Sequence, residues 1–258
     1  MLKKNPCDVD HFFSSIRGIA TKRDYCVEEL GFVGGDPICL LRPRLTKRRP
    51  CVLVAAGFHG EEPAGCWGLL NFLETADDNL FLECAISFLP LINPTGIRKG
   101  RRYNDWGENP NNGFCHTPSG RPEPSREGKI LIENIEVLKK CSRDGFLSLH
   151  EDIDCTEFYI YTFEKSNTPG RFSITLKTTE ECFFKPKPDG IFEGENLING
   201  IIFNHCDGSF EDLMFHEGIP RSACTETPGK LDFSLRVAAN TKIINSFVNF
   251  HISKTNSE

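Results

Sequence analysis

The stretch Val52–Gly65, with the sequence VLVAAGFHGEEPAG, constrains the fold of this chain more than any other segment. Five apolar residues over Val52–Ala56 end at a glycine, and Pro63 then marks the start of an expected helix. A buried strand that turns into a helix is typical of α/β folds, which bind ligands beyond the carboxyl ends of their strands. His59 and Glu62 stand at that position. We therefore expect a ligand site at the end of this strand.

Apolar strand patterns and amphipathic helix patterns alternate along the whole chain, without a repeat or a change in composition. A length of 258 residues would also fit two small domains. The alternation favours one α/β domain over residues 1–258, with a core at about 50–250 and a mixed sheet covered by helices on both faces. The expected strands are Asp24–Leu30, Pro37–Arg42, Cys51–Ala56, Cys84–Leu91, Gly145–His150, Phe158–Phe163 and Pro220–Thr227, and the expected helices are Asp8–Thr21, Pro63–Thr75, Lys129–Cys141 and Asp232–Phe250.

Three connections carry polar or turn-forming residues. Arg42–Pro50 is a basic loop whose lysine and arginines we expect to be solvated. Asn93–Gly96 (NPTG) reads as a turn. Ile97–Arg126 is a long polar segment without periodicity, and a loop of that length inside a compact domain usually serves a function.

Composition excludes several classes of protein. The formal charge of −6 argues against nucleic acid as a partner. No run reaches the ~18 apolar residues that a membrane span needs, and the first residues lack the apolar core of a signal peptide. We therefore expect a cytoplasmic protein. The 12 cysteines form no C-x-x-C pair and favour reduced thiols, although their even number is also compatible with disulfides.

A third candidate ligand repeats the placement of His59. His150 ends the apolar strand Gly145–His150. If the two strands are neighbours, His59, Glu62 and His150 converge, and two histidines with one glutamate form a known catalytic zinc set with an open fourth position. The alternative is a chance H-x-x-E motif and a histidine that packs in the core. The three together predict one Zn²⁺ per chain, equipped to activate water.

Such a centre needs a general base, and Glu226 is our candidate. It lies in ACTETPG, at the end of the expected late strand. A carboxylate there could take a proton from water and pass it to a leaving nitrogen. Three acidic neighbours of the expected ligands are alternatives, although carboxylates in such places more often orient the ligands. These alternatives are Glu61, Glu151 and Asp152.

Basic residues crowd the segment after Asn93–Gly96 and indicate a substrate with a negative charge. Arginine can bind a carboxylate through two hydrogen bonds or polarise a carbonyl group. A solvated basic loop is the other interpretation. The residues concerned are Arg98, Lys99, Arg101 and Arg102, with Asn104, Asn111 and Asn112 further along.

Taken together, these motifs resemble the zinc metallocarboxypeptidases, the carboxypeptidase A family, over about residues 50–235. The order is H-x-x-E after a strand, N-P-x-G before an arginine and Asn-Asn region, a strand-final histidine and a late strand-final glutamate. The resemblance implies a mixed sheet of about eight strands between helices. The small size is most similar to the bacterial murein tripeptide amidase branch, and the succinylglutamate desuccinylase/aspartoacylase branch is the nearest alternative.

The resemblance assigns roles position by position. His59, Glu62 and His150 match the zinc ligands. Glu226 matches the general base, and Arg102 matches the arginine that polarises the carbonyl. For the substrate, Asn111 matches the asparagine that grips a terminal carboxylate, Arg101 is a basic residue of the same loop, and Phe210 falls near the base of the specificity pocket.

Two departures concern substrate recognition. The arginine that usually accompanies Asn111 is here Asn112, so that Arg98, Lys99 or Arg101 would have to supply the charge of the carboxylate clamp. The tyrosine that usually covers the substrate has no match in this chain. Phe203 stands near the position where that tyrosine would be expected.

The resemblance implies a zinc-dependent hydrolase. We expect it to cleave a C-terminal or isopeptide amide bond in a small peptide or amino-acid amide that carries a carboxylate, such as a murein peptide. An N-acyl amino acid deacylase and an inactive zinc-binding module are the alternatives. The sequence does not indicate the oligomeric state.

Overall fold

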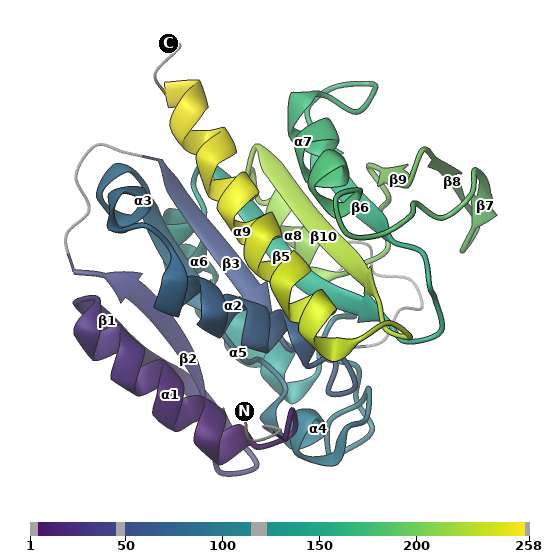
Figure 1. Ribbon diagram of the computed structural model, residues 1–258. Helices are drawn as coiled ribbons and strands as arrows, with labels where there is room; N and C mark the ends of the chain where they lie inside the picture. Colours follow the sequence, from purple (N-terminus) through teal and green to yellow (C-terminus); the bar gives the residue numbers. More distant parts are fainter. Residues whose placement is uncertain (1–4, 45–49, 115–122, 256–258) are drawn as a thin grey trace.

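A mixed sheet runs through the molecule, and helices cover both of its faces (Figure 1). The computed structural model describes residues 5–44, 50–114 and 123–255. Within these ranges the sheet has 10 strands in the order β1-β2-β4-β3-β5-β10-β6-β9-β8-β7. The strands are β1 Tyr25–Val33, β2 Asp36–Pro43, β3 Cys51–Ala56, β4 Ala85–Leu89, β5 Gly145–Asp152, β6 Tyr159–Glu164, β7 Gly190–Phe192, β8 Glu195–Ile198, β9 Ile201–Phe203 and β10 Arg221–Pro228.

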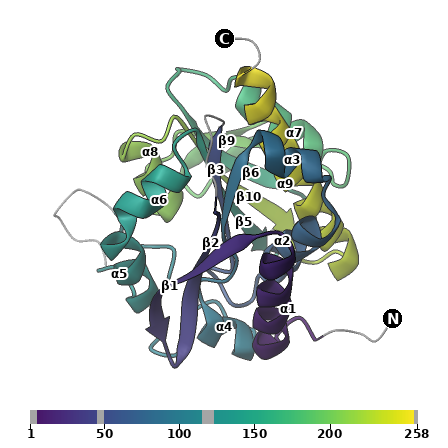
Figure 2. The same ribbon diagram turned by 90° about the vertical axis from the view of Figure 1, so that its left-hand side faces the viewer.

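The helices form two layers, one on each side of the sheet (Figure 2). One layer contains α1, α2, α7 and α9, and the other contains α5, α6 and α8. The helices are α1 Val9–Lys22, α2 Ala64–Thr75, α3 Asp78–Glu83, α4 Pro94–Lys99, α5 Arg126–Glu133, α6 Ile135–Cys141, α7 Arg171–Glu180, α8 Phe210–His216 and α9 Phe233–Thr255.

The centre of the sheet is a parallel unit. Strand β3 pairs in parallel with β4 on one side and with β5 on the other, and β10 pairs in parallel with β5. The carboxyl ends of β3, β5 and β10 therefore lie at the same edge of the sheet. The strand that precedes His59 and the strand that contains His150 are therefore neighbours, as the convergence of the candidate ligands requires.

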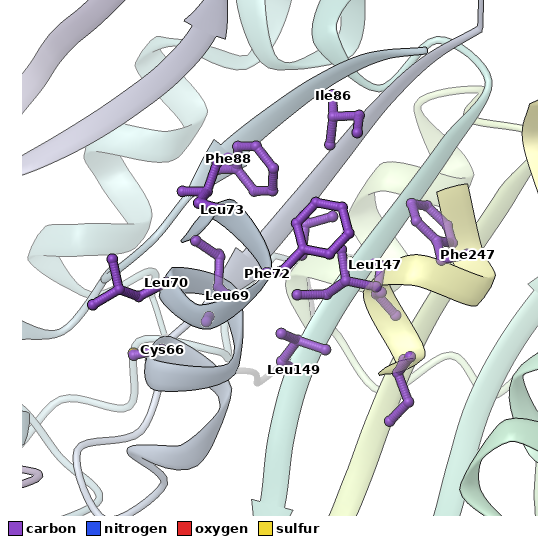
Figure 3. Packing of buried hydrophobic residues seen from close by; sticks show 14 of the residues in the cluster. Cys66, Leu69, Leu70, Phe72, Leu73, Ile86, Phe88, Leu147, Leu149 and Phe247 are labelled. Atoms are coloured by element: carbon purple, nitrogen blue, oxygen red, sulfur yellow. The ribbon is translucent and has the colours of Figure 1, made fainter. Parts of the chain in front are cut away.

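The first helical layer packs its apolar face directly on these central strands. Helix α2 is buried along most of its length, and Figure 3 shows its leucines and phenylalanine against side chains from β4, β5 and α9. Burying each such side chain contributes about 1.5–3 kcal/mol, so this contact fixes α2 relative to the site at its N-terminus. The residues in view include Leu69, Leu70, Phe72, Leu73, Phe88, Leu147, Leu149 and Phe247.

Several elements differ from the sequence expectations. The NPTG segment begins helix α4 rather than a simple turn, because the Asn93 side chain accepts a hydrogen bond from the Gly96 amide and caps the helix. The expected helix Lys129–Cys141 is two helices that meet at Asn134, whose side chain bonds back to the Ile130 carbonyl. Short strands beyond β6 bring the sheet to 10 strands rather than about eight. Helices α3, α7 and α8 were not expected.

Two further expectations concern the chain as a whole. No helix in the described ranges is both long and apolar enough to cross a membrane. The described cysteines, Cys115 not being among them, form no disulfide with one another. The basic residues Lys47–Arg49 of the expected solvated loop lie outside the described residues.

Candidate active site

A cleft of about 410 Å³ opens at the carboxyl edge of the central strands. His59, Glu62 and His150 lie at its base, and each is at least 96% buried. His59 and Glu62 come from the connection between β3 and α2, and His150 lies near the end of β5. The cleft therefore brings together the three residues that the sequence singled out as metal ligands.

Glu62 bridges the two histidines. Its Oε1 lies 2.7 Å from His59 Nδ1, and its Oε2 lies 2.8 Å from His150 Nδ1. The ligand atoms of the three residues all lie within 4.8 Å of one another. Although burial acts to raise the pKa of Glu62, the two histidines hold it well below its usual range, so the carboxylate stays ionised.

The outer nitrogens of both rings also face oxygen atoms. His59 Nε2 lies 2.9 Å from Asn109 Oδ1, which is oriented by the Asn111 amide, and His150 Nε2 lies 3.5 Å from Glu211 Oε1. A neutral imidazole has one N–H. If Nε2 carries this hydrogen and donates it outward, Nδ1 presents a lone pair to the anionic Glu62 carboxylate, and the two repel each other. A cation between the Nδ1 atoms and the carboxylate resolves this conflict. The donor set therefore fits a divalent metal held by nitrogen and oxygen.

Backbone contacts between two loops hold His59 and Glu62 in place. Gly60 packs so closely on the Gly96 backbone of α4 that a side chain there would clash with it. Asn93 is fully buried, and its side-chain amide donates to the carbonyl groups of Phe58 and Arg102, at 3.1 Å each. Asn93 thus fixes the α4 loop, which carries Arg102, to the loop that carries His59.

Glu226 lies opposite His150 in the register of β10 and β5. It lines the cleft, and its carboxylate, the Cys224 thiol and a His150 ring nitrogen lie within 4.8 Å of one another. Burial and then the charge of Glu62 raise the pKa of Glu226 well above its usual range, against the opposing effects of His150 and Arg102. The strand order places this carboxylate beside the candidate centre.

The three acidic alternatives have other partners. The carboxylate of Glu151 accepts a hydrogen bond from the Ala64 amide at the start of α2 and forms an ion pair with Arg236. Asp152 accepts a hydrogen bond from the Tyr159 hydroxyl at 3.0 Å. Glu61 lies 3.7 Å from Arg102. Each lines the cleft, but Glu151 is engaged in holding two helices in place.

Arg102 is the basic residue that reaches the centre. Its guanidinium lies 3.2 Å from Glu62 Oε1, and the side chain is 42% exposed. The expectation that another basic residue of this loop replaces the missing charge of the clamp is corrected by the structure. Arg98 pairs with Asp10 and Asp36, whereas Lys99 and Arg101 both pair with Asp105, and none of the three lines the cleft.

The remaining predicted substrate residues separate into two groups. Asn111 and Asn112 line the cleft, and the Asn111 amide donates to Glu211 Oε2 at 3.1 Å. Phe210 does not line it, which corrects the expectation of a pocket floor. Its ring is fully buried in the second core, against Phe58 and Phe146, because α8 begins there and turns this side chain inward.

Several residues of the cleft were missed in the sequence. Tyr159 and Tyr161 lie two apart on β6, so that both point to one face, whereas Phe203 on β9 does not line the cleft. The alternation in YIYTF was the available signal. No comparable pattern marked the others, which come from separate loops. They include Asn109, Ile153, Asp154, Phe163, Glu193, Asp207, Ser209, Glu211 and Cys224.

Comparison with known proteins supports this fold. Residues 48–160 match the family model of the succinylglutamate desuccinylase/aspartoacylase catalytic domain. The crystal structure of a candidate metallopeptidase from Shewanella amazonensis is 40% identical, with 95% of this chain and 94% of that chain covered and a TM-score of 0.91. The chain belongs to this metallopeptidase-like family. A second member, from Shewanella denitrificans, is 39% identical over 95% of this chain and 91% of that chain, with a TM-score of 0.89.

The fold of the chain is also that of a metallo-carboxypeptidase. A metallo-carboxypeptidase from Burkholderia cenocepacia superposes with a TM-score of 0.70 at 16% identity, with 95% of this chain and 69% of that chain covered. At this identity the comparison shows the fold, and it agrees with the resemblance to zinc carboxypeptidases. No curated protein sequence matches the chain.

Proposed function

We propose that this protein is a metal-dependent amide hydrolase that carries one Zn²⁺ per chain. His59, Glu62 and His150 would hold the metal. The observation that carries the proposal is the bridging of both histidine Nδ1 atoms by Glu62, directly beside Glu226. Two histidines and a carboxylate leave room for water and substrate at a catalytic zinc. The bound metal would acidify that water and polarise a carbonyl group.

The other residues of the cleft have roles that follow from their positions. Glu226 would take the proton of the attacking water and return it to the leaving nitrogen. The Arg102 guanidinium would donate hydrogen bonds to the developing oxyanion. Asn109 and Glu211 would hold the two imidazole rings with Nδ1 facing the metal.

The substrate would be a small peptide or an amino-acid amide. Among the described residues that line the cleft, Arg102 is the single arginine or lysine available to a substrate carboxylate. Cleavage of a C-terminal or isopeptide bond, and a murein peptide as substrate, remain predictions. A cytoplasmic location also remains a prediction.

An N-acyl amino acid deacylase is the second candidate. The match of residues 48–160 to the succinylglutamate desuccinylase/aspartoacylase catalytic domain favours it. The same three metal-binding residues and the same base would serve both reactions. The two differ in the product, which is a free C-terminal amino acid for the peptidase and a small carboxylic acid for the deacylase.

The test is a product assay with the zinc-loaded protein on a panel of C-terminal peptides and N-acyl amino acids. We expect turnover of one class, and a loss of at least ~10² in kcat for Glu226→Gln with zinc still bound. His59→Ala should lose the metal, as measured by elemental analysis. Glu195→Gln, a carboxylate on β8 that does not line the cleft, serves as the matched control.

Three results would contradict the proposal. Turnover by Glu226→Gln equal to that of the unchanged protein would exclude Glu226 as the general base, and no turnover of either substrate class by the zinc-loaded protein would indicate a centre that binds metal without catalysing hydrolysis. A wild-type preparation that takes up no stoichiometric metal, with His59→Ala behaving identically, would exclude every metal-dependent alternative.

A further inference from the structure

The lining of the active-site cleft is strongly acidic. Among the described residues, nine carboxylate side chains line it, against the single guanidinium of Arg102. Arg102 and a bound divalent cation together would offset three of these negative charges, and Arg236 on α9 forms an ion pair with the Glu151 carboxylate. The nine are Glu61, Glu62, Glu151, Asp152, Asp154, Glu193, Asp207, Glu211 and Glu226.

The basic residues that could have balanced this charge are engaged elsewhere. The position at which the resemblance to zinc carboxypeptidases implies an arginine is Asn112, and its side-chain oxygen accepts a hydrogen bond from the Gly113 amide. Arg98, Lys99 and Arg101 form ion pairs with aspartates outside the cleft. A substrate with several negative charges would therefore meet repulsion along most of the cleft.

One wall of the cleft is aromatic. Tyr159, Tyr161 and Phe163 occupy alternate positions on β6 and line the same face. The Tyr161 hydroxyl donates to Glu193 at 2.8 Å, which joins a ring to a carboxylate at the tip of the β7–β8 hairpin. Aromatic faces beside carboxylates are the surroundings that proteins use to bind ammonium and guanidinium groups.

The chain itself places an ammonium group near one ring of this wall. Lys187, which does not line the cleft, has its Nζ 5.5 Å from the centre of the Tyr159 ring and 4.2 Å from that of Phe192. The Tyr159 ring of this wall therefore lies close to an ammonium group of the chain itself.

We propose that the substrate carries a cationic group, an ammonium or a guanidinium, which binds between the β6 aromatic wall and the carboxylates of Glu193 and Asp207. The inference rests on the proposed hydrolase function and names its substrate class. It separates this protein from an enzyme that acts on dicarboxylates, because those would place a second negative charge in an acidic cleft. The scissile amide would then lie over the histidines, with Arg102 at its carbonyl.

The experiment uses four substrates that share one scissile amide and differ in the adjoining side chain: lysine, norleucine, Nε-acetyl-lysine and glutamate. We expect kcat/KM of the zinc-loaded protein for the lysine substrate to exceed that for norleucine and acetyl-lysine by about tenfold or more, with glutamate lowest. The advantage should shrink between about 0.1 M and 0.5 M salt, because salt screens partly exposed charges. Equal or better turnover of norleucine or glutamate would overturn the inference.

Glu193→Gln and Asp207→Asn should each reduce the lysine-to-norleucine ratio several-fold. Glu195→Gln, on the same hairpin but outside the cleft, should leave the ratio unchanged. Melting temperatures would identify a variant that is merely unstable. If the ratio is the same in both cleft variants and in the control, the carboxylates do not select the cation.

A binding measurement separates failure of this inference from failure of the hydrolase proposal. Calorimetry on zinc-loaded Glu226→Gln with the same four compounds needs no turnover. Lysine binding more tightly than norleucine without hydrolysis in the wild type would retain the inference and reject the function. Hydrolysis with tighter binding of glutamate would retain the function and reject the inference.

Discussion

At the scale of single residues, the candidate centre is defined by what each imidazole nitrogen faces. Both rings have an oxygen acceptor near each nitrogen, and Glu62 lies between the inner pair. These facing nitrogen and oxygen atoms are stable either when the imidazole rings carry an extra proton each or when a cation lies between them. The Glu211 carboxylate also depends on a histidine. Burial acts to raise the pKa of Glu211, but the contact with His150 lowers it to about 2.

A buried residue far from this chemistry gives a prediction about stability. Glu180 at the end of α7 is fully buried, and neither of its carboxylate oxygens has a hydrogen-bond partner. Burial raises its pKa to about 8, from 4.5 in the unfolded chain. The folded protein therefore retains a proton that the unfolded chain releases above pH 4.5. The contribution of Glu180 to stability is complete below pH 4.5 and is lost as the pH rises to about 8, by roughly 1.4 kcal/mol per pH unit.

We expect Glu180→Gln to raise the free energy of unfolding by a few kcal/mol at pH 8 and to change it little at pH 4.5. Urea unfolding at the two pH values measures this difference. The exposed Glu133→Gln should show no such dependence. An equal effect of Glu180→Gln at both pH values would show that ionisation of Glu180 is not the cause.

At the scale of elements, the site depends on how closely two loops approach. The β3–α2 loop supplies His59 and Glu62, and the α4 loop supplies Arg102. They meet where Gly60 lies against Gly96, and the Gly60 amide hydrogen-bonds to the Arg102 carbonyl. Without a side chain at residue 60, the guanidinium can lie within reach of the Glu62 carboxylate.

Gly60→Ala should therefore separate the two loops. We expect a loss of stability of about 1–3 kcal/mol, as for overpacking in a core, together with a large fall in kcat. Gly18→Ala on α1 is the control, because that glycine has open space around it and alanine favours a helix. Thermal unfolding and turnover measure the two effects. Wild-type turnover in Gly60→Ala would indicate that the close approach is not needed.

At the scale of the whole molecule, the candidate metal centre connects segments that are 88 residues apart in the chain. Glu62 follows β3, and His150 lies on β5, at the carboxyl edge of the sheet. A ligand that binds only the folded arrangement of these residues stabilises the fold by mass action.

Zinc should accordingly raise the melting temperature of the chelator-treated protein by several degrees. The increase should be absent in His59→Ala, whereas the control Glu195→Gln should retain it. Differential scanning calorimetry with and without zinc measures the shift. An equal increase in His59→Ala would place the stabilising metal at another site.

The sequence by itself determined the central strands and the long helices, the three candidate ligands and the candidate base. These are local signals: the β3 run ends as expected at Ala56, and His59, His150 and Glu226 each stand at or near the end of such a run. The periodicity of apolar residues and the position of a polar residue after them depend on neighbours in the chain. The ligands and the base meet in one cleft because of the strand order, and no local sequence pattern contains that order.

The tertiary structure decided which charges reach the cleft. Arg98, Lys99, Arg101 and Arg102 are indistinguishable as a basic cluster in the sequence, yet three of them form ion pairs with aspartates outside the cleft and one reaches Glu62. The acidic lining was equally hidden, because its carboxylates come from separate loops. The chemistry proposed for the centre thus followed from local sequence, whereas the charge that we propose selects a substrate depends on how distant segments pack.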